Sequence, residues 1–229
     1  MSTAVERVIV ALDHPTAAEA LSLARRLRPR LVRAKIGAAL FTTAGSDVVR
    51  SLQDLGLRVF LDLKLHDIPS VVEAAARAVA RLGVEFLSVH LAGGTAMVRA
   101  ALEGAGSTKI LGVTLLSSLD AAACASVGFS GTPEQSVLRL ARLGRDAGVD
   151  GIVASAREAA ALRSLLPPPT RIVTPGIRPA GTPAGDQART ATPAEAIRAG
   201  ADLLVVGRPV SAAADPVAAF DAVAREACA

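Results

Sequence analysis

The chain has 229 residues, of which 51% are hydrophobic, and its formal net charge at pH 7 is +4. These values suit one globular domain with a large apolar core, and we expect residues 1–229 to form it. No apolar run approaches the roughly 18 residues of a membrane span, and the first residues lack the pattern of a secretory signal. We therefore expect a cytoplasmic protein without a membrane partner.

The high isoelectric point, about 9.8, does not by itself indicate nucleic-acid binding. Most basic residues are arginines scattered along the expected helices, and the chain has no Trp or Tyr to stack on bases. The two cysteines, Cys124 and Cys228, are too few and too far apart for a disulfide framework or a metal site. We therefore expect neither nucleic acid nor a metal ion as a partner.

Short apolar segments alternate with alanine-rich segments from one end of the chain to the other. In chain order we expect strands at residues 7–13, 31–37, 58–64, 86–92, 109–116, 151–155, 171–177 and 203–208. Between and after them we expect helices at residues 15–28, 45–55, 70–82, 95–103, 133–147, 156–165, 193–199 and 215–227. Eight such units favour a closed (β/α)8 TIM barrel of the α/β class over an open doubly wound sheet.

Lysine is rare in this chain, because only three of the 25 basic residues are lysines, and two of them stand at strand ends. These are Lys35 and Lys64, the second within Asp62-Leu63-Lys64-Leu65-His66-Asp67-Ile68-Pro69. The lysine ammonium is a compact charge that can give up a proton. The arginine charge is spread over a planar group and does not give up its proton at accessible pH. An Asp-x-Lys pair is usually a surface salt bridge, but the apolar neighbours predict a buried strand, where charges are rarely retained without a partner or a function. The segment therefore indicates a catalytic charge cluster.

The barrel architecture predicts how this cluster is assembled, because barrel chemistry lies at the carboxyl ends of the strands. Asp62 and Lys64 are two residues apart, so we expect their side chains on one face, about 7 Å apart along a regular strand. Lys35, at the end of the preceding strand, can lie beside Asp62, and such contacts would keep Lys64 charged. Asp67 comes after the strand, next to Pro69, so a neighbouring subunit could supply it. We expect His90 to be a packed residue near the barrel mouth.

The last two strands end in residues that suit a phosphate group. Pro175-Gly176-Ile177-Arg178 ends the seventh expected strand, and Gly207-Arg208 ends the eighth. Barrels often bind phosphate at these two strand ends. Glycine lets a backbone N–H approach a phosphate oxygen, and arginine offers two parallel donors. A Gly-Arg pair alone is a weak signal, but the long segment 179–185 strengthens the prediction of a phosphate site.

The motif at residues 62–69 resembles the signature of the orotidine 5′-phosphate decarboxylase family. Further similar segments follow the family's order across nearly the whole chain: Ala11-Leu12-Asp13, Lys35-Ile36-Gly37 with Leu40-Phe41, Val89-His90 with Gly93-Gly94, Thr114 to Ser118, Thr174-Pro175-Gly176-Ile177-Arg178, Gly185-Asp186-Gln187, Thr192-Pro193 and Val206-Gly207-Arg208-Pro209. The length is similar to that of the short prokaryotic members. The resemblance implies decarboxylation of orotidylate to uridylate without a cofactor, the last step of pyrimidine synthesis.

The resemblance also implies catalytic roles. Lys64 would protonate C6 of the pyrimidine as carbon dioxide leaves, and Asp62 would face the substrate carboxylate and hold Lys64. Lys35 would pair with Asp62 and touch the ribose. Asp67 would reach the site of the partner subunit, which makes a homodimer obligatory.

The substrate-binding residues divide by the part of the substrate that the resemblance assigns to them. Asp13 would bind a ribose hydroxyl, and Ser117 or Ser118 would contact the edge of the pyrimidine. Gln187 would bridge the base and the phosphate. The phosphate end would be bound by Arg178, Gly207 and Arg208. Two positions depart from the family's pattern, because Val71 and Ser117 both stand where threonine is common.

Two alternatives stay open. A sugar-phosphate decarboxylase or aldolase-like synthase of the same barrel suprafamily shares an Asp-x-Lys-x-x-Asp core and uses Mg²⁺. That site needs an extra acid near the end of the second strand, where this chain has Lys35 and no acid before Asp47. The other alternative is a nucleotide-binding barrel without catalytic activity, against which the complete Lys35, Asp62, Lys64 and Asp67 set argues.

Overall fold

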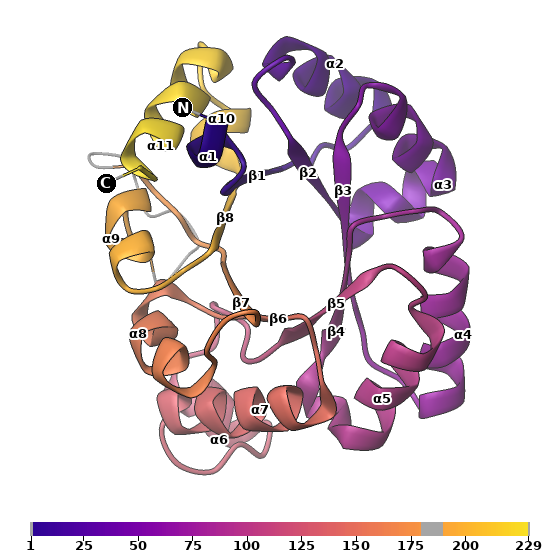
Figure 1. The fold of residues 1–229 in the computed structure, drawn as a ribbon, viewed down its shortest axis with the longest axis vertical. Helices are drawn as coiled ribbons and strands as arrows, with labels where there is room; N and C mark the ends of the chain where they lie inside the picture. Colours follow the sequence, from indigo (N-terminus) through magenta and orange to yellow (C-terminus); the bar gives the residue numbers. More distant parts are fainter. Residues whose placement is uncertain (1, 180–189, 229) are drawn as a thin grey trace.

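A computed structural model of the chain describes residues 2–179 and 190–228. Eight parallel strands pair with their neighbours in chain order, and the last pairs with the first to close a barrel. Helices surround the strands on the outside (Figure 1). The predicted α/β class and (β/α)8 architecture are confirmed.

All eight predicted strands are present, but most end earlier than the apolar pattern indicated. Their bounds are β1 Val8–Ala11, β2 Arg33–Gly37, β3 Arg58–Leu65, β4 Phe86–His90, β5 Lys109–Val113, β6 Gly151–Val153, β7 Arg171–Thr174 and β8 Leu203–Val206. The expected strand at 109–116, for example, loses its partner on β6 after Val113. An apolar run continues where pairing has stopped, because residues at the barrel mouth can be buried without belonging to the sheet.

The helices follow the strands as predicted, with some additions. Their bounds are α1 Ser2–Val5, α2 Ala17–Leu27, α3 Ala38–Asp54, α4 Pro69–Ala80, α5 Gly94–Gly104, α6 Ala121–Ser126, α7 Pro133–Ala147, α8 Ala156–Leu165, α9 Pro193–Arg198, α10 Arg208–Ser211 and α11 Pro216–Glu226, with a 3₁₀ turn η1 at Leu91–Gly93. The short elements α1, η1, α6 and α10 were not predicted, because three to six residues carry too little periodicity. Within the two described ranges, no helix is long and apolar enough to cross a membrane.

The third helix begins earlier than predicted. It starts at Ala38 rather than at residue 45, and Gly45 has φ 60° and ψ −152°, which is not helical. The glycine that we expected to begin the helix therefore marks a kink between two helical parts.

Alternation along the strands separates the barrel interior from the layer under the helices. The interior cluster consists of Ile9, Ala11, Phe60, Phe86, Leu111, Val173, Leu203 and Val205. The rings of Phe60 and Phe86 meet edge to face, with centroids 6.1 Å apart. Asp13 and Asp62 follow Ala11 and Phe60 by two residues, and successive strand residues point to opposite faces. The alternation that fills the interior therefore also brings these carboxylates to the barrel mouth.

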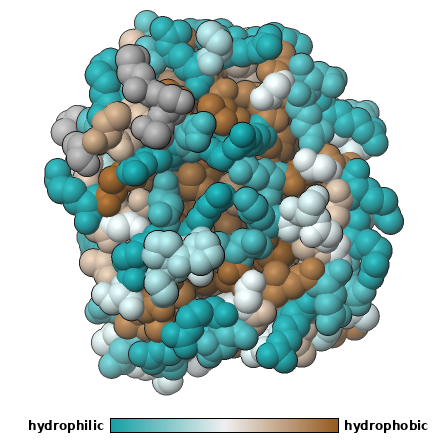
Figure 2. Space-filling model, viewed as in Figure 1, coloured by the Kyte–Doolittle hydropathy of each residue, from teal (hydrophilic) through white to brown (hydrophobic). Residues whose placement is uncertain are grey.

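The helices present their polar faces to the outside. In the view along the barrel, polar side chains (teal) form most of the outline, and apolar side chains (brown) are concentrated further in (Figure 2). This arrangement matches amphipathic helices whose apolar stripes cover the sheet. The polar outline of the molecule in this view is therefore explained by the alternation of polar and apolar residues along the helices.

An ion-pair network lies at the opposite end of the barrel, where the strands begin. Glu85 accepts hydrogen bonds from Nε and Nη2 of Arg33, at 2.8 and 3.1 Å. Arg58 and Arg171 lie 3.9 and 4.0 Å from the same carboxylate, and the Arg171 guanidinium also lies over the Phe86 ring. These three arginines begin β2, β3 and β7. All three lie within strands that the sequence predicted, and the starts of these strands converge on one carboxylate.

We expect Glu85→Gln to lower the free energy of unfolding by about 3 kcal/mol, because it leaves the buried Arg33 without its counter-charge. Urea denaturation of the variant and the wild type measures this difference. Asp221→Asn is the matched control, since it breaks the more exposed pair with Arg30 and should lower the free energy by less than about 1 kcal/mol. Equal losses in the two variants would show that the Glu85 network does not stabilise the barrel.

Candidate active site

A cavity of about 440 Å³ opens at the carboxyl ends of the strands. Its apolar wall includes Phe60, Val113 and Val153, which belong to β3, β5 and β6. The predicted site residues that line it are Asp13, Lys35, Asp62, Lys64, Ser117, Arg178, Gly207 and Arg208. Residues far apart in sequence are brought together here because parallel strands end at the same edge of the barrel.

Four charged side chains form a row along one side of this cavity. Lys35 Nζ lies 3.0 Å from Asp13 Oδ1 and 3.4 Å from Asp62 Oδ2. Lys64 Nζ lies 2.7 Å from the same Asp62 Oδ2. The charges therefore alternate from Asp13 to Lys64. The two central side chains, Lys35 and Asp62, are about one-tenth exposed, whereas those of Asp13 and Lys64 are 62% and 34% exposed.

The electrostatic environment keeps Asp62 ionised. Burial of the carboxyl raises its pKa, but the positive charges of Lys35 and Lys64 and hydrogen bonds from Lys64 and Ser88 act in the opposite direction. The balance places the pKa of Asp62 below its usual value. A buried negative charge is thus maintained directly beside the Lys64 ammonium.

The backbone of Lys64 departs from the regular strand that we predicted. β3 and β4 pair at Leu61↔Leu87 and next at Leu65↔Val89, so β3 advances by four residues while β4 advances by two. Lys64 has φ 51° and is the only non-glycine residue of the described chain with a positive φ. This conformation costs roughly 1–2 kcal/mol. Asp62 and Lys64 do share one face, as predicted, but their contact forms across a bulge rather than along a regular strand.

Ser88 on β4 holds this bulge and was not predicted as a site residue. Its hydroxyl accepts a hydrogen bond from the Lys64 backbone N–H at 2.9 Å and donates one to Asp62 Oδ1 at 2.7 Å. The side chain is completely buried. The sequence contained a signal for this role. Ser88 carries the hydroxyl side chain within an otherwise apolar stretch of its strand, and it stands two residues after the interior Phe86, so its side chain is expected on the interior face.

Two arginines also line the cavity. Arg178 is buried, and its Nη1 donates a hydrogen bond to the carbonyl of Ile177 at 3.0 Å. Burial, and the positive charge of Arg208 nearby, lower the pKa of Arg178. Arg208 is the first residue of α10 and follows Gly207. Two guanidinium groups that line one cavity suit the binding of an anion there.

Two predicted residues do not line the cavity, and a third is not among the described residues. Asp67 is exposed, its Oδ1 accepts a hydrogen bond from the Ile68 N–H at 2.7 Å, and it is not among the described residues that line the cavity of its own chain. Ser118 is exposed, while the neighbouring Ser117 lines the cavity. Gln187 lies outside the described residues, as does most of the segment 179–185.

The two histidines near the mouth pack against each other. The rings of His66 and His90 have centroids 5.5 Å apart. Burial, followed by electrostatic interactions with His66 and Lys64, lowers the pKa of His90. His90 is therefore a packed residue beside the charge row, as its place in the strand indicated.

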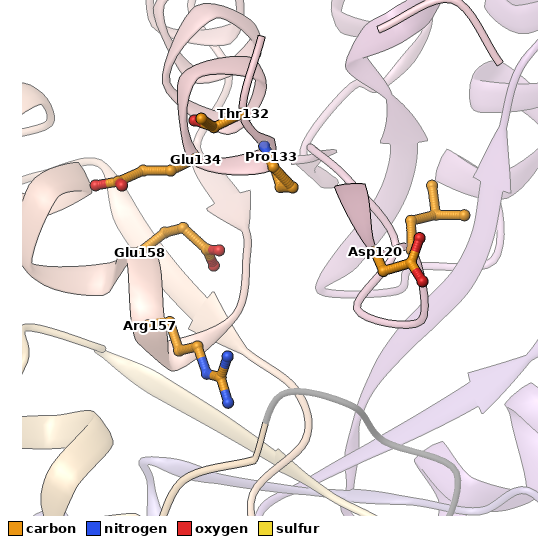
Figure 3. Close-up of a pocket in the computed structure, with 7 residues that line it drawn as sticks. Asp120, Thr132, Pro133, Glu134, Arg157 and Glu158 are labelled. Carbon is orange, nitrogen blue, oxygen red and sulfur yellow. The ribbon is translucent and has the colours of Figure 1, made fainter. Parts of the chain in front are cut away.

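A second and larger cavity, of about 570 Å³, lies between the first turns of α6, α7 and α8 (Figure 3). Asp120 Oδ1 accepts a hydrogen bond from Ala123 N–H and Thr132 Oγ1 accepts one from Gln135 N–H, so these polar groups cap helices. The lining residues are Leu119, Asp120, Thr132, Pro133, Glu134, Arg157 and Glu158. None of them is a predicted site residue, so the smaller cavity is the candidate active site.

The fold and this cavity define a class of protein. It is a TIM barrel with alternating carboxylates and ammonium groups at the carboxyl ends of its strands, where barrel enzymes carry their active sites.

Comparisons with known proteins agree with this class and narrow it. The sequence profile of the Orotidine 5'-phosphate decarboxylase / HUMPS family matches residues 6–223. A curated orotidine 5'-phosphate decarboxylase of Anaeromyxobacter sp. is 54% identical over 220 residues, which cover 96% of this chain and 97% of the relative. One of Halorhodospira halophila is 51% identical over 224 residues, which cover 96% and 95%. The crystal structure of orotidine 5'-phosphate decarboxylase from Lactobacillus acidophilus has a TM-score of 0.87 and 36% identity, and covers 97% of this chain and 99% of that chain.

The chain belongs to the orotidine 5'-phosphate decarboxylase / HUMPS family. The resemblance that the motifs indicated is thereby confirmed.

Proposed function

We propose that this protein is a carbon–carbon lyase that decarboxylates orotidine 5'-monophosphate to uridine 5'-monophosphate in de novo pyrimidine biosynthesis. The observation that carries the proposal is the row Asp13, Lys35, Asp62 and Lys64, which lines a cavity that is also lined by Arg178 and Arg208. Relatives more than 50% identical over nearly the whole chain are named as this enzyme. We further propose a single domain spanning residues 1–229 that acts in the cytoplasm on these small nucleotides.

The proposed chemistry uses only fixed charges of the chain. As the bond between C6 and the carboxylate breaks, carbon dioxide leaves and the electron pair stays on C6. The Lys64 ammonium stabilises this developing negative charge and then donates its proton to C6. Asp62 faces the substrate carboxylate and holds Lys64 in place, as their 2.7 Å contact allows. The proposed reaction therefore needs no cofactor or metal.

The remaining contacts follow the shape of the cavity. Asp13 and Lys35 would bind the ribose beside the charge row, and Ser117, rather than the exposed Ser118, would contact the pyrimidine. Gln187 would bridge the base and the phosphate. The phosphate would be held by Arg178, Gly207 and Arg208. Binding of the remote phosphate can contribute energy that is realised at the reacting carbon.

The proposed assembly is a homodimer with shared sites. Asp67 is exposed and stands outside the cavity of its own chain, while the adjacent Ile68 and Val71 are 63% and 45% exposed. Apolar side chains grouped on a surface commonly mark an interface. We therefore propose that Asp67 completes the site of the partner subunit, next to its Lys64.

Turnover of orotidylate by chelator-treated protein tests the proposal. We expect EDTA to leave the decarboxylation rate unchanged, because Lys64 supplies both the charge and the proton. The absorbance difference between orotidylate and uridylate gives the rate. Complete loss on chelation with recovery in Mg²⁺ would favour the sugar-phosphate alternative. Binding of the nucleotide without turnover would favour the inactive barrel.

A further inference from the structure

We propose that Ser88 is a positioning residue of this site. Its hydroxyl bonds both the backbone N–H of Lys64 and the carboxylate of Asp62, and these two bonds fix the position of the Lys64 ammonium. The kinetic part of this inference rests on the proposed function. Its structural part, that Ser88 maintains the bulge at Lys64, does not.

The hydrogen bonds around Ser88 close a ring. The Lys64 backbone N–H donates to Ser88 Oγ, and Ser88 Oγ donates to Asp62 Oδ1. The other oxygen of that carboxylate, Oδ2, accepts a hydrogen bond from Lys64 Nζ at 2.7 Å. The ring therefore begins at the backbone of Lys64 and ends at the tip of the same side chain. Fixing both ends of a long, flexible side chain restricts where its ammonium can lie.

The Ser88 hydroxyl replaces a backbone acceptor that the sheet does not provide for the Lys64 N–H. In a parallel sheet the backbone N–H of a strand residue donates to a carbonyl of the neighbouring strand. Between Leu61 and Leu65 the ladder of β3 with β4 shifts register, and the Lys64 N–H bonds to a side chain instead. Without the hydroxyl, the donor of a residue at φ 51° would lose its acceptor. Rotation toward negative φ would relieve the strained backbone, and this rotation would move the ammonium.

The same hydroxyl also acts on the charge of Asp62. Its hydrogen bond is one of the interactions that lower the pKa of this carboxyl, after the effects of burial, Lys35 and Lys64. Removing the donor should raise the pKa of Asp62. If the ionised carboxylate is the active form, the acidic limb of the rate profile then moves to higher pH.

Ser88→Ala tests the inference. We expect kcat to fall roughly tenfold to hundredfold, because a small misplacement of a reacting group has effects of this size, with a much smaller change in KM. The acidic limb of the kcat profile should move to higher pH. Independently of activity, hydrogen exchange of the Lys64 amide, followed by NMR, should become faster. Ser88→Thr keeps the hydroxyl and should recover most of kcat and of the amide protection.

Ser136→Ala is the matched control. Ser136 is also buried, and its hydroxyl also donates one hydrogen bond, to the Ser130 carbonyl, and accepts one, from Arg139. It lies on α7 and does not line the candidate active site. This variant should keep the kcat, the pH profile and the Lys64 amide exchange of the wild type, even if its melting temperature falls.

Failure of the Ser88 inference can be distinguished from failure of the proposed function. If the wild type does not decarboxylate orotidylate, the function is wrong, and the Lys64 amide exchange still decides whether Ser88 holds the bulge. If the wild type is active and Ser88→Ala keeps its kcat, its pH profile and its amide protection, the inference is overturned. If Ser88→Ala does not fold, Ser88→Cys, with its weaker donor, should show the same changes, and wild-type behaviour of that variant would overturn the inference.

Discussion

Mixing inactive Lys64→Ala and Asp67→Ala homodimers should restore decarboxylation. One variant lacks the proposed proton donor, and the other lacks a charge that the proposal places beside that donor in the partner's site. After subunit exchange, a heterodimer has both defects in one site and two wild-type residues in the other. We expect activity to approach half of the wild-type value per heterodimer. The exposed position of Asp67, outside the cavity of its own chain, is the structural reason.

A second mixture provides the control for this complementation. Asp62 and Lys64 contact each other within one chain, so Lys64→Ala and Asp62→Ala leave a defect in each site of their heterodimer. This pair should stay inactive. Native mass spectrometry of differently tagged chains establishes that exchange has occurred. If exchange is complete and the Lys64 and Asp67 variants still show no recovery, Asp67 acts within its own subunit.

Removing the two arginines of the cavity should lower the activity on phosphorylated substrate much more than the activity on unphosphorylated substrate. Each charge-assisted contact with a phosphate contributes about 1.5–3 kcal/mol, and about 1.4 kcal/mol corresponds to tenfold. We expect Arg208→Ala to lower kcat/KM for orotidylate about tenfold or more, and Arg178→Ala with Arg208→Ala to lower it on the order of a thousandfold. Steady-state kinetics with orotidylate and orotidine measures both effects.

The comparison of substrates makes this prediction specific. The double variant should lose little activity toward orotidine, because that substrate has no phosphate to contact Arg178 and Arg208. Arg157→Ala is the matched control, since Arg157 lines the second cavity rather than this one. Equal activity of the wild type on orotidine and orotidylate would contradict the assignment of a phosphate site.

Much of the architecture could be predicted from local patterns. Strand alternation and helix periodicity repeat within a few residues, so all eight strands and the long helices were located from the sequence. α7 and α8 match the expected bounds. Short elements such as α6 and α10 were missed, because they contain too few residues for a period to show.

The candidate site was predictable in its residue types but not in its contacts. Lys35, Asp62 and Lys64 stand out in the sequence because charges are rare in buried strands, and the barrel rule directs them to one mouth. The role of Ser88 in the site could not be deduced in this way. It stands 24 residues from Lys64, and its contacts exist only because β4 pairs with β3 in one register.

The sequence by itself determined the repeating (β/α) pattern, the family and the charged residues that meet at the barrel mouth, because each depends on residue order alone. The tertiary structure decided that Lys64 leaves the regular strand, that Ser117 rather than Ser118 lines the cavity, and that Asp67 lies outside it. These features depend on strand register and on the paths of loops. Both are set by hydrogen bonds and packing between segments far apart in the chain, which local periodicity does not encode.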